Sequence, residues 1–169
     1  LTKARLPWLF LGLIGGVGAF IIMEGFQGVF SKYAALFFFT PLIAAMAGNV
    51  GVQSSAIIVQ GLANNNIKGS LWTRLMKEIG LSLVNGVILA LLVLAYGAFQ
   101  GFNLTVNYAI ASSLIIVIII AALIGTFVPI ILDKKGIDPA LATGPFITTS
   151  NDIFGILIYF WIAKMMLGF

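Results

Sequence analysis

The sequence predicts an all-α integral membrane protein with five transmembrane helices in each subunit. Hydrophobic residues make up 61% of the 169 residues and charged residues only 8%, whereas about a quarter of the residues in a soluble domain are charged. The apolar segments are long and unbroken, which favours helices over the alternating ~10-residue strands of a membrane β-barrel. Because a helix needs about 20 residues to cross the hydrocarbon core, a single pore domain, 1–169, has room for about five spans.

The absence of cysteine and histidine narrows the chemistry that the chain can carry. It excludes disulfides, thiol catalysis and the usual zinc, copper and haem ligands, so a bound metal ion must be a hard one held by oxygen. We expect no enzyme: a serine–histidine dyad is impossible, and an aspartic protease needs two facing aspartates, whereas Asp138 lies more than three helical turns from Asp152. The basic residues flank apolar segments instead of forming one patch, which argues against nucleic acid.

The first helix is expected over about 7–30, with Pro7 and Trp8 at its start as helix initiator and interfacial anchor. Four glycines give it a small-residue face for close packing: Gly12, Gly15, Gly16 and Gly18. Glu24 lies at its far end, where it is either a solvated helix terminus or an acidic residue at the mouth of an ion path.

The second helix is expected over 33–63, which is too long for one straight perpendicular span, and Pro41 is a candidate kink. At about 100° per residue its polar and small residues fall on two neighbouring stripes, with Asn49, Gln53 and Gln60 on one and Ala44, Gly48, Gly51 and Ser55 on the other. These residues either pack against another helix or line a polar path.

The third and fourth helices are expected over 70–99 and 106–132. The third carries only Ser82 and Asn85 as clearly polar residues. The fourth is aliphatic from Leu114 to Ala122, so we expect it to face lipid.

The fifth helix is expected over 139–167, with Asp138 as its N-cap and an interruption at Gly144–Pro145. One face of this helix is polar, since Thr148, Asp152, Gly155 and Tyr159 share it. A carboxylate such as that of Asp152 costs about 2.5–3.5 kcal/mol within a membrane span. It should therefore face a wet cavity, a partner or an ion.

The positive charges predict the orientation. With five spans, one side of the membrane carries seven of the nine basic residues: Lys3, Arg5, Lys68, Arg74, Lys77, Lys134 and Lys135. The other side carries Lys32 and Lys164. The positive-inside rule then places the N-terminus in the cytoplasm and the C-terminus outside a multi-pass plasma-membrane protein surrounded by lipid.

If the polar faces of the second and fifth helices meet, they form an oxygen-lined path with negative charge, which suits a cation. One carboxylate per chain is few for a dehydrated divalent ion, but a symmetric dimer has two, and magnesium keeps several waters on one or two carboxylates. From the residues alone, two interpretations remain. One is a channel, and the other is a proton- or sodium-coupled transporter that uses Asp152 as its coupling acid. A non-transporting scaffold is the third reading.

Two long motifs resemble the MgtE magnesium channel family. Residues 41–54 (PLIAAMAGNVGVQS) and 60–63 (QGLA) resemble the second transmembrane helix of that family. Residues 138–140 (DPA), 144–149 (GPFITT) and 152–155 (DIFG) resemble the fifth. Residues 5–9 (RLPWL) match the start of its first helix. The chain departs from the family in Ala47, often glycine there, and in Gln60, often arginine, which removes a positive charge near the cytoplasmic end.

The resemblance implies a homodimer with its pore at the subunit interface, lined by the second and fifth helices. It implies passive transport of hydrated Mg²⁺ into the cytoplasm, with Mn²⁺, Co²⁺ or Ca²⁺ as further ions. Asp152 would bind the ion in the pore, Asn49 would help to form the filter, Asp138 would bind Mg²⁺ at the cytoplasmic mouth, and Glu24 would be the outer acidic residue. The remaining pore-lining residues would be Gly48, Gly51, Gln53, Thr148, Thr149, Asn151 and Gly155. The family's N-terminal cytoplasmic regulatory domain, with paired CBS modules, is absent from these residues. Either it is a further partner that belongs to a longer chain, or this protein is a short relative without it.

Overall fold

The computed structural model describes residues 2–64, 70–141 and 144–168, and the regular structure within these ranges is entirely helical. The elements are α1 (Thr2–Gly25), α2 (Gln27–Lys32), α3 (Ala34–Ala63), α4 (Leu71–Phe99), α5 (Leu104–Lys134), a 3-10 turn (Pro139–Leu141) and α6 (Pro145–Leu167). The expected all-α class is confirmed. Lys68, which contributes to the charge asymmetry, lies outside the described residues.

Within the described residues, four helices are long and apolar enough to cross a membrane: α3, α4, α5 and α6. The apolar part of α1, Leu9–Gly25, is a shorter segment. At 1.5 Å per residue its 17 residues extend about 25 Å, slightly less than the ~30 Å hydrocarbon core.

Two of the expected helical ranges are each divided in the structure. The range 7–30 contains a turn at Phe26, after which the short helix α2 leads toward α3. The range 139–167 contains the 3-10 turn and then α6, which begins at Pro145. Gly144 precedes this start with φ of 88°, a conformation that only glycine adopts without strain. Gly144 and Pro145 together therefore set where α6 begins.

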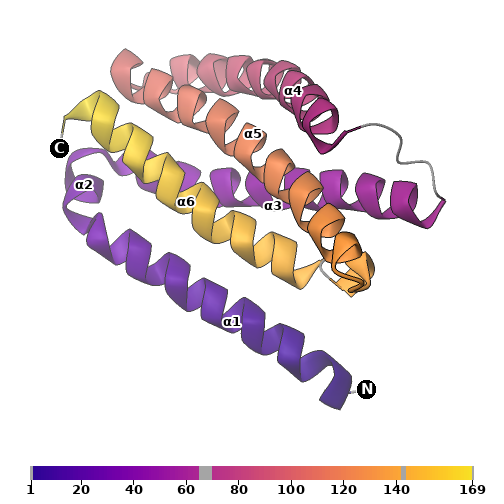
Figure 1. Ribbon diagram of the computed structural model, residues 1–169. Helices are drawn as coiled ribbons and strands as arrows, with labels where there is room; N and C mark the ends of the chain where they lie inside the picture. Colours follow the sequence, from indigo (N-terminus) through magenta and orange to yellow (C-terminus); the bar gives the residue numbers. More distant parts are fainter. Residues whose placement is uncertain (1, 65–69, 142–143, 169) are drawn as a thin grey trace.

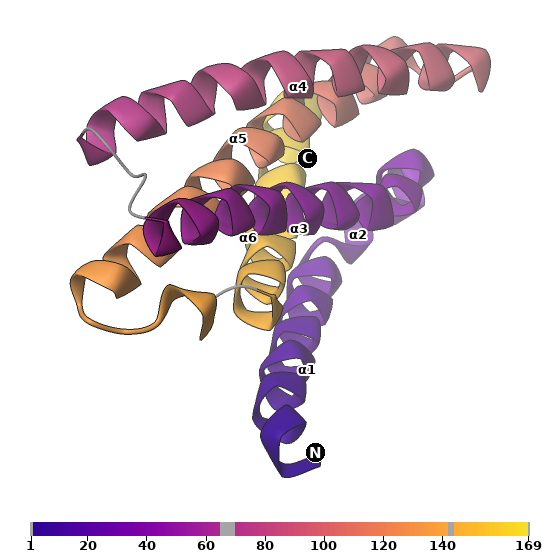
Figure 2. The same cartoon turned by 90° about the vertical axis from the view of Figure 1, so that its right-hand side faces the viewer.

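The helices form an open bundle in which α1 lies along α6, and its N-terminal part extends away from the other helices (Figures 1 and 2). On the other side, α4 packs along α5, and α5 in turn contacts α3 and α6. Thus α3, α5 and α6 form the centre, and α1 and α4 cover it on different sides. The glycine face expected for α1 contributes to its packing, since Gly15 faces Thr149 and Gly18 faces Ile153 of α6.

The expectation that the fourth helix faces lipid is wrong, because α5 is the most buried of the candidate spans. Ile110, Leu114 and Ile118 on this helix have at most 1% of their surface exposed. A helix that is apolar on all sides is suited to the centre of a bundle. There α5 contacts three other helices, α3, α4 and α6. Its uniform composition is equally compatible with lipid and with a core, so packing decides between them.

Hydrogen bonds between helices accompany this packing near the ends of the bundle. The Tyr159 hydroxyl of α6 donates to the carbonyl oxygen of Leu36 in α3 over 2.9 Å, and both residues are buried. The Asn107 side chain of α5 donates to the carbonyl oxygen of Leu94 in α4 over 2.9 Å. At the other end of α3, the Ser54 hydroxyl donates to the Glu78 carboxylate of α4 over 2.5 Å. These hydrogen bonds connect α3 with α6 and with α4, and α4 with α5.

Glycines allow the central helices to approach closely. A Cβ atom added at Gly125 of α5 would overlap the carbonyl oxygen of Gly51 in α3. Without a hydrophobic driving force between helices in lipid, such small-residue contacts are a main source of helix association.

We therefore expect Gly125→Ala to destabilise the protein. Forcing a methyl group into a filled site costs about 1–3 kcal/mol, which lowers Tm by at least about 2 °C in a domain of this size. The measurement is thermal unfolding of the purified protein in mild detergent. Gly16→Ala is the control, since a Cβ there meets no atom within 4 Å, and its Tm should not fall. Equal Tm values for Gly125→Ala and the unaltered protein would contradict this packing.

Candidate cation site

A cavity of about 470 Å³ lies between α3 and α6. Eight residues line it: Ala44, Ala45, Gly48, Asn49, Val52, Gln53, Thr148 and Asp152. Five of these are among the expected pore-lining or metal-binding residues, namely Gly48, Asn49, Gln53, Thr148 and Asp152. The structure thus brings together Asn49 and Gln53 from the polar stripe of α3 with Thr148 and Asp152 from the polar face of α6, whereas Gln60 of the same stripe is not among the cavity residues.

Asp152 approaches α3 because residue 48 is glycine. A Cβ atom at Gly48 would lie 3.3 Å from Asp152 Oδ1 and 3.4 Å from Thr148 Cγ2. Asp152 is two helical turns into α6 and only half-buried. Across the described ranges, its carboxylate has no hydrogen bond or ion pair with another side chain or with the backbone.

The side chains that line the cavity are of the kinds that suit a hydrated hard cation. Its polar lining residues are Asp152 with a carboxylate, Asn49 and Gln53 with amides, and Thr148, which carries a hydroxyl beside the methyl group that faces Gly48. Such oxygens suit Mg²⁺ and similar ions. At about 30 Å³ per water molecule, six waters occupy on the order of 180 Å³, so the cavity has room for an ion with its first water shell.

One chain supplies few charged ligands to this site. No group of three or more histidine, cysteine, aspartate or glutamate side chains that could hold a metal ion occurs among the described residues. The side chains of Asn49 and Gln53 are exposed on the outer surface of α3. A cation here would therefore keep its water or gain ligands from another molecule.

Three of the expected pore-lining residues lie at helix contacts and not in this cavity. Gly51 faces the side chain of Asn151, and a Cβ atom at Gly51 would overlap that amide. Asn151 is 1% exposed, and neither polar atom of its side chain has a hydrogen-bond partner in the part of the chain that the structure describes. Gly155 is packed against Ala47 and Val117.

The other three candidate residues are distributed around the fold. Thr149 points toward Gly15 of α1. Asp138 lies in the connection before α6, where its Oδ1 accepts a hydrogen bond from the backbone N–H of Ala140 over 2.9 Å, so its capping role is present at the 3-10 turn. Glu24 is exposed near the C-terminal end of α1.

Sequence reasoning missed two residues of the cavity wall, Ala45 and Val52. Both are spaced four residues from polar or small cavity residues, Ala45 from Asn49 and Val52 from Gly48. Helical periodicity places such residues on the same side of α3. Because they carry no polar group, only this spacing could have identified them.

Comparison with known proteins gives consistent matches to one family. Residues 40–162 match the family model MgtE, described as a divalent cation transporter. Three similar proteins are each named magnesium transporter MgtE. The protein of Bacillus subtilis is 39% identical over 160 residues, which cover 94% of this chain and 36% of the relative. That of Enterococcus faecalis is 36% identical over 169 residues, covering 99% of this chain and 37% of the relative. That of Thermus thermophilus is 32% identical over 168 residues, again covering 99% and 37%.

The chain spans little more than a third of the length of these curated relatives. The part matched by the family model nevertheless includes most of α3 and α6 and all of the residues that line the cavity.

The role of Gly48 in this geometry can be tested with Gly48→Ala. The added methyl group narrows the cavity beside Asp152 and Thr148, so we expect weaker cation binding. A bound ion raises Tm by mass action, and the increase in Tm on adding MgCl₂ should be smaller in Gly48→Ala than in the unaltered protein. The control is Gly80→Ala in α4, where a Cβ meets no atom within 4 Å. The same Mg²⁺-dependent increase in all three proteins would contradict the assigned site.

Proposed function

The chain belongs to the MgtE family of divalent cation transporters, and from that premise we propose that it forms the pore of a passive channel that carries hydrated Mg²⁺ into the cytoplasm. The observation that carries this proposal is the cavity between α3 and α6, where a carboxylate, two amides and a hydroxyl come together. The names of the relatives support magnesium as the transported ion. Mn²⁺, Co²⁺ and Ca²⁺ are further candidate ions, since oxygen ligands bind them as well.

A second copy of the chain completes the proposed pore. In a symmetric dimer each residue near the two-fold axis meets its own copy, so two Asp152 carboxylates would face one ion. Two carboxylates with retained water are a usual arrangement for Mg²⁺. The exposed polar side of α3, with Asn49 and Gln53, is a suitable surface for this contact. In this assembly α1 acts as the fifth span.

We place two of the four acidic residues outside the cavity, Asp138 and Glu24, at the ends of the proposed path. Asp138 would bind Mg²⁺ at the cytoplasmic mouth, in addition to capping the turn before α6. Glu24 is exposed near the C-terminal end of α1, which the proposed orientation places outside the cell. There it would attract cations. The orientation follows the positive-inside rule, with the N-terminus in the cytoplasm, where a regulatory domain would precede α1.

The main test of the proposal is Mg²⁺ flux into proteoliposomes. Asp152→Asn removes the charge from the cavity but keeps the size of the side chain, so we expect flux to fall by about tenfold or more, which corresponds to a loss of roughly 1.4 kcal/mol. Asp133→Asn is the matched control, because Asp133 is exposed at the end of α5, outside the cavity. Unchanged flux and selectivity in Asp152→Asn would refute the proposed role. Accumulation of Mg²⁺ against its gradient, driven by protons or sodium, would instead indicate a coupled transporter.

The dimer can be tested by cysteine cross-linking, because the chain contains no cysteine of its own. Two cysteines form a disulfide only when their Cα atoms lie within about 7 Å. With α3 at the two-fold axis, Gln53→Cys should yield a covalent dimer under mild oxidation in membranes. Ile88→Cys, which is 54% exposed on α4, should yield much less. Equal cross-linking at both positions would contradict a dimer contact through α3.

A further inference from the structure

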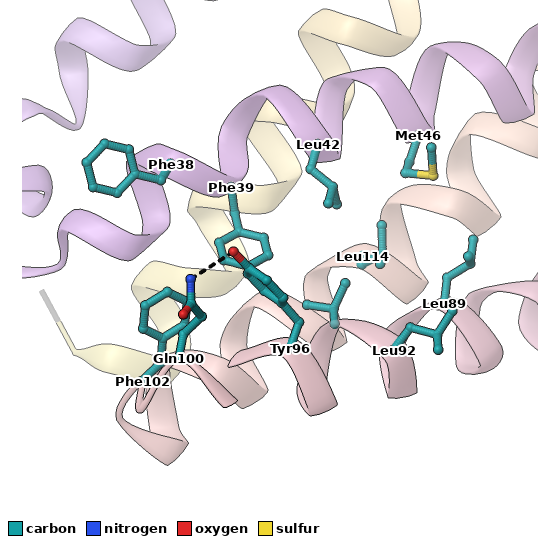
Figure 3. A pocket seen from close by; sticks show the side chains of 11 residues that line it. Phe38, Phe39, Leu42, Met46, Leu89, Leu92, Tyr96, Gln100, Phe102 and Leu114 are labelled. Carbon is teal, nitrogen blue, oxygen red and sulfur yellow. Dashed lines mark hydrogen bonds between the residues drawn. The ribbon is translucent and has the colours of Figure 1, made fainter. Parts of the chain in front are cut away.

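A second and larger cavity lies between α3 and α4, away from Asp152. Its volume is about 670 Å³. Figure 3 shows Leu42 and Met46 of α3 opposite Leu89 and Leu92 of α4, with Leu114 of α5 between the two helices. Leu114 is buried, whereas Leu92 is 62% exposed. The cavity is therefore a groove with its floor on α5 and an opening at the outer surface of the bundle.

The groove is polar at one end only. There the Gln100 side-chain amide donates a hydrogen bond to the Tyr96 hydroxyl over 2.9 Å (Figure 3). Gln100 follows directly after the last residue of α4, Phe99, so this end coincides with the end of the bundle. The rest of the wall that these helices supply is apolar, down to Met46 and Leu89.

The length of the groove matches the depth of one leaflet. It extends along α3 from Phe38 to Met46, and these residues are eight steps apart, which at 1.5 Å per step is about 12 Å. Half of the ~30 Å hydrocarbon core is about 15 Å. An acyl chain that enters the groove at Tyr96 and Gln100 and reaches Met46 would thus extend from the polar interface nearly to the midplane of the membrane.

The surroundings of the groove decide what fills it. Both α3 and α4 are candidate membrane spans, so the groove opens sideways into acyl chains. Water is a poor occupant, since an ordered water needs two to four polar partners, and the polar pair lies only at the mouth.

We propose that this groove binds one acyl chain of a membrane phospholipid, with the ester and headgroup region against Tyr96 and Gln100. The acyl chain packs on the side of α3 next to the one that carries Gly48 and Asn49. A bound lipid is then a direct neighbour of the helix that lines the cation cavity.

The test is native mass spectrometry of the full chain, purified from vesicles of phosphatidylglycerol and phosphatidylethanolamine in mild detergent. We expect the unaltered protein to retain one phospholipid per chain. Leu89→Trp fills the groove and should lose this lipid, whereas the matched control Ile88→Trp should retain it, because Ile88 is exposed on α4 outside the groove. Met46→Phe is a second groove-filling variant, which keeps the test decisive if Leu89→Trp does not fold.

Three results would overturn the proposal. The first is that the unaltered protein retains no phospholipid. The second is equal lipid retention in the groove-filling variants and in Ile88→Trp. The third is selective loss of the dimer mass in the groove-filling variants, which would mean that a second copy of the chain occupies the groove.

Discussion

The close approach of α6 to α3 places the side chains of the candidate cation site. Gly48 and Gly51 of α3 face Asp152 and Asn151 of α6, and neither position has room for a Cβ atom without a shift of its neighbour. In lipid, where apolar surface gains little from contact with another helix, small residues allow the backbone contact that holds helices together. The same glycines that bind α6 to α3 therefore bring a carboxylate to the side of α3.

The free-energy cost of a carboxylate within a membrane span explains why Asp152 lies at a polar cavity. An aspartate within a membrane span is expensive unless it faces water, a partner or an ion. The cavity beside Asp152 offers room for water, and amides and a hydroxyl from two helices surround it. In the proposed dimer the second chain adds its own carboxylate, and a hydrated divalent cation offsets both charges. The proposed pore at the subunit interface would complete a site to which one chain supplies a single carboxylate.

Helical periodicity predicted part of this arrangement. It placed Asn49 and Gln53 on one side of α3 and Thr148 and Asp152 on one side of α6, and these residues do line one cavity. Asn151 belongs to the same polar stretch of sequence, but it is turned by about 100° from Asp152 and is buried against Gly51. Periodicity could not identify the central helix, because the uniformly apolar α5 suits lipid and a protein core equally well. That choice depends on contacts such as the one between Gly125 and Gly51, which no single segment of sequence specifies.

The central claim is that two copies of Asp152 share one hydrated cation. Diffraction from crystals grown with Mn²⁺ as a substitute for Mg²⁺ tests it most directly, because Mn²⁺ prefers the same oxygen ligands and has a measurable anomalous signal. We expect an anomalous peak on a two-fold axis, between the Asp152 carboxylates of two chains and separated from them by water. A dimer in which the Asp152 side chains lie apart, or a peak that survives in Asp152→Asn, would contradict it.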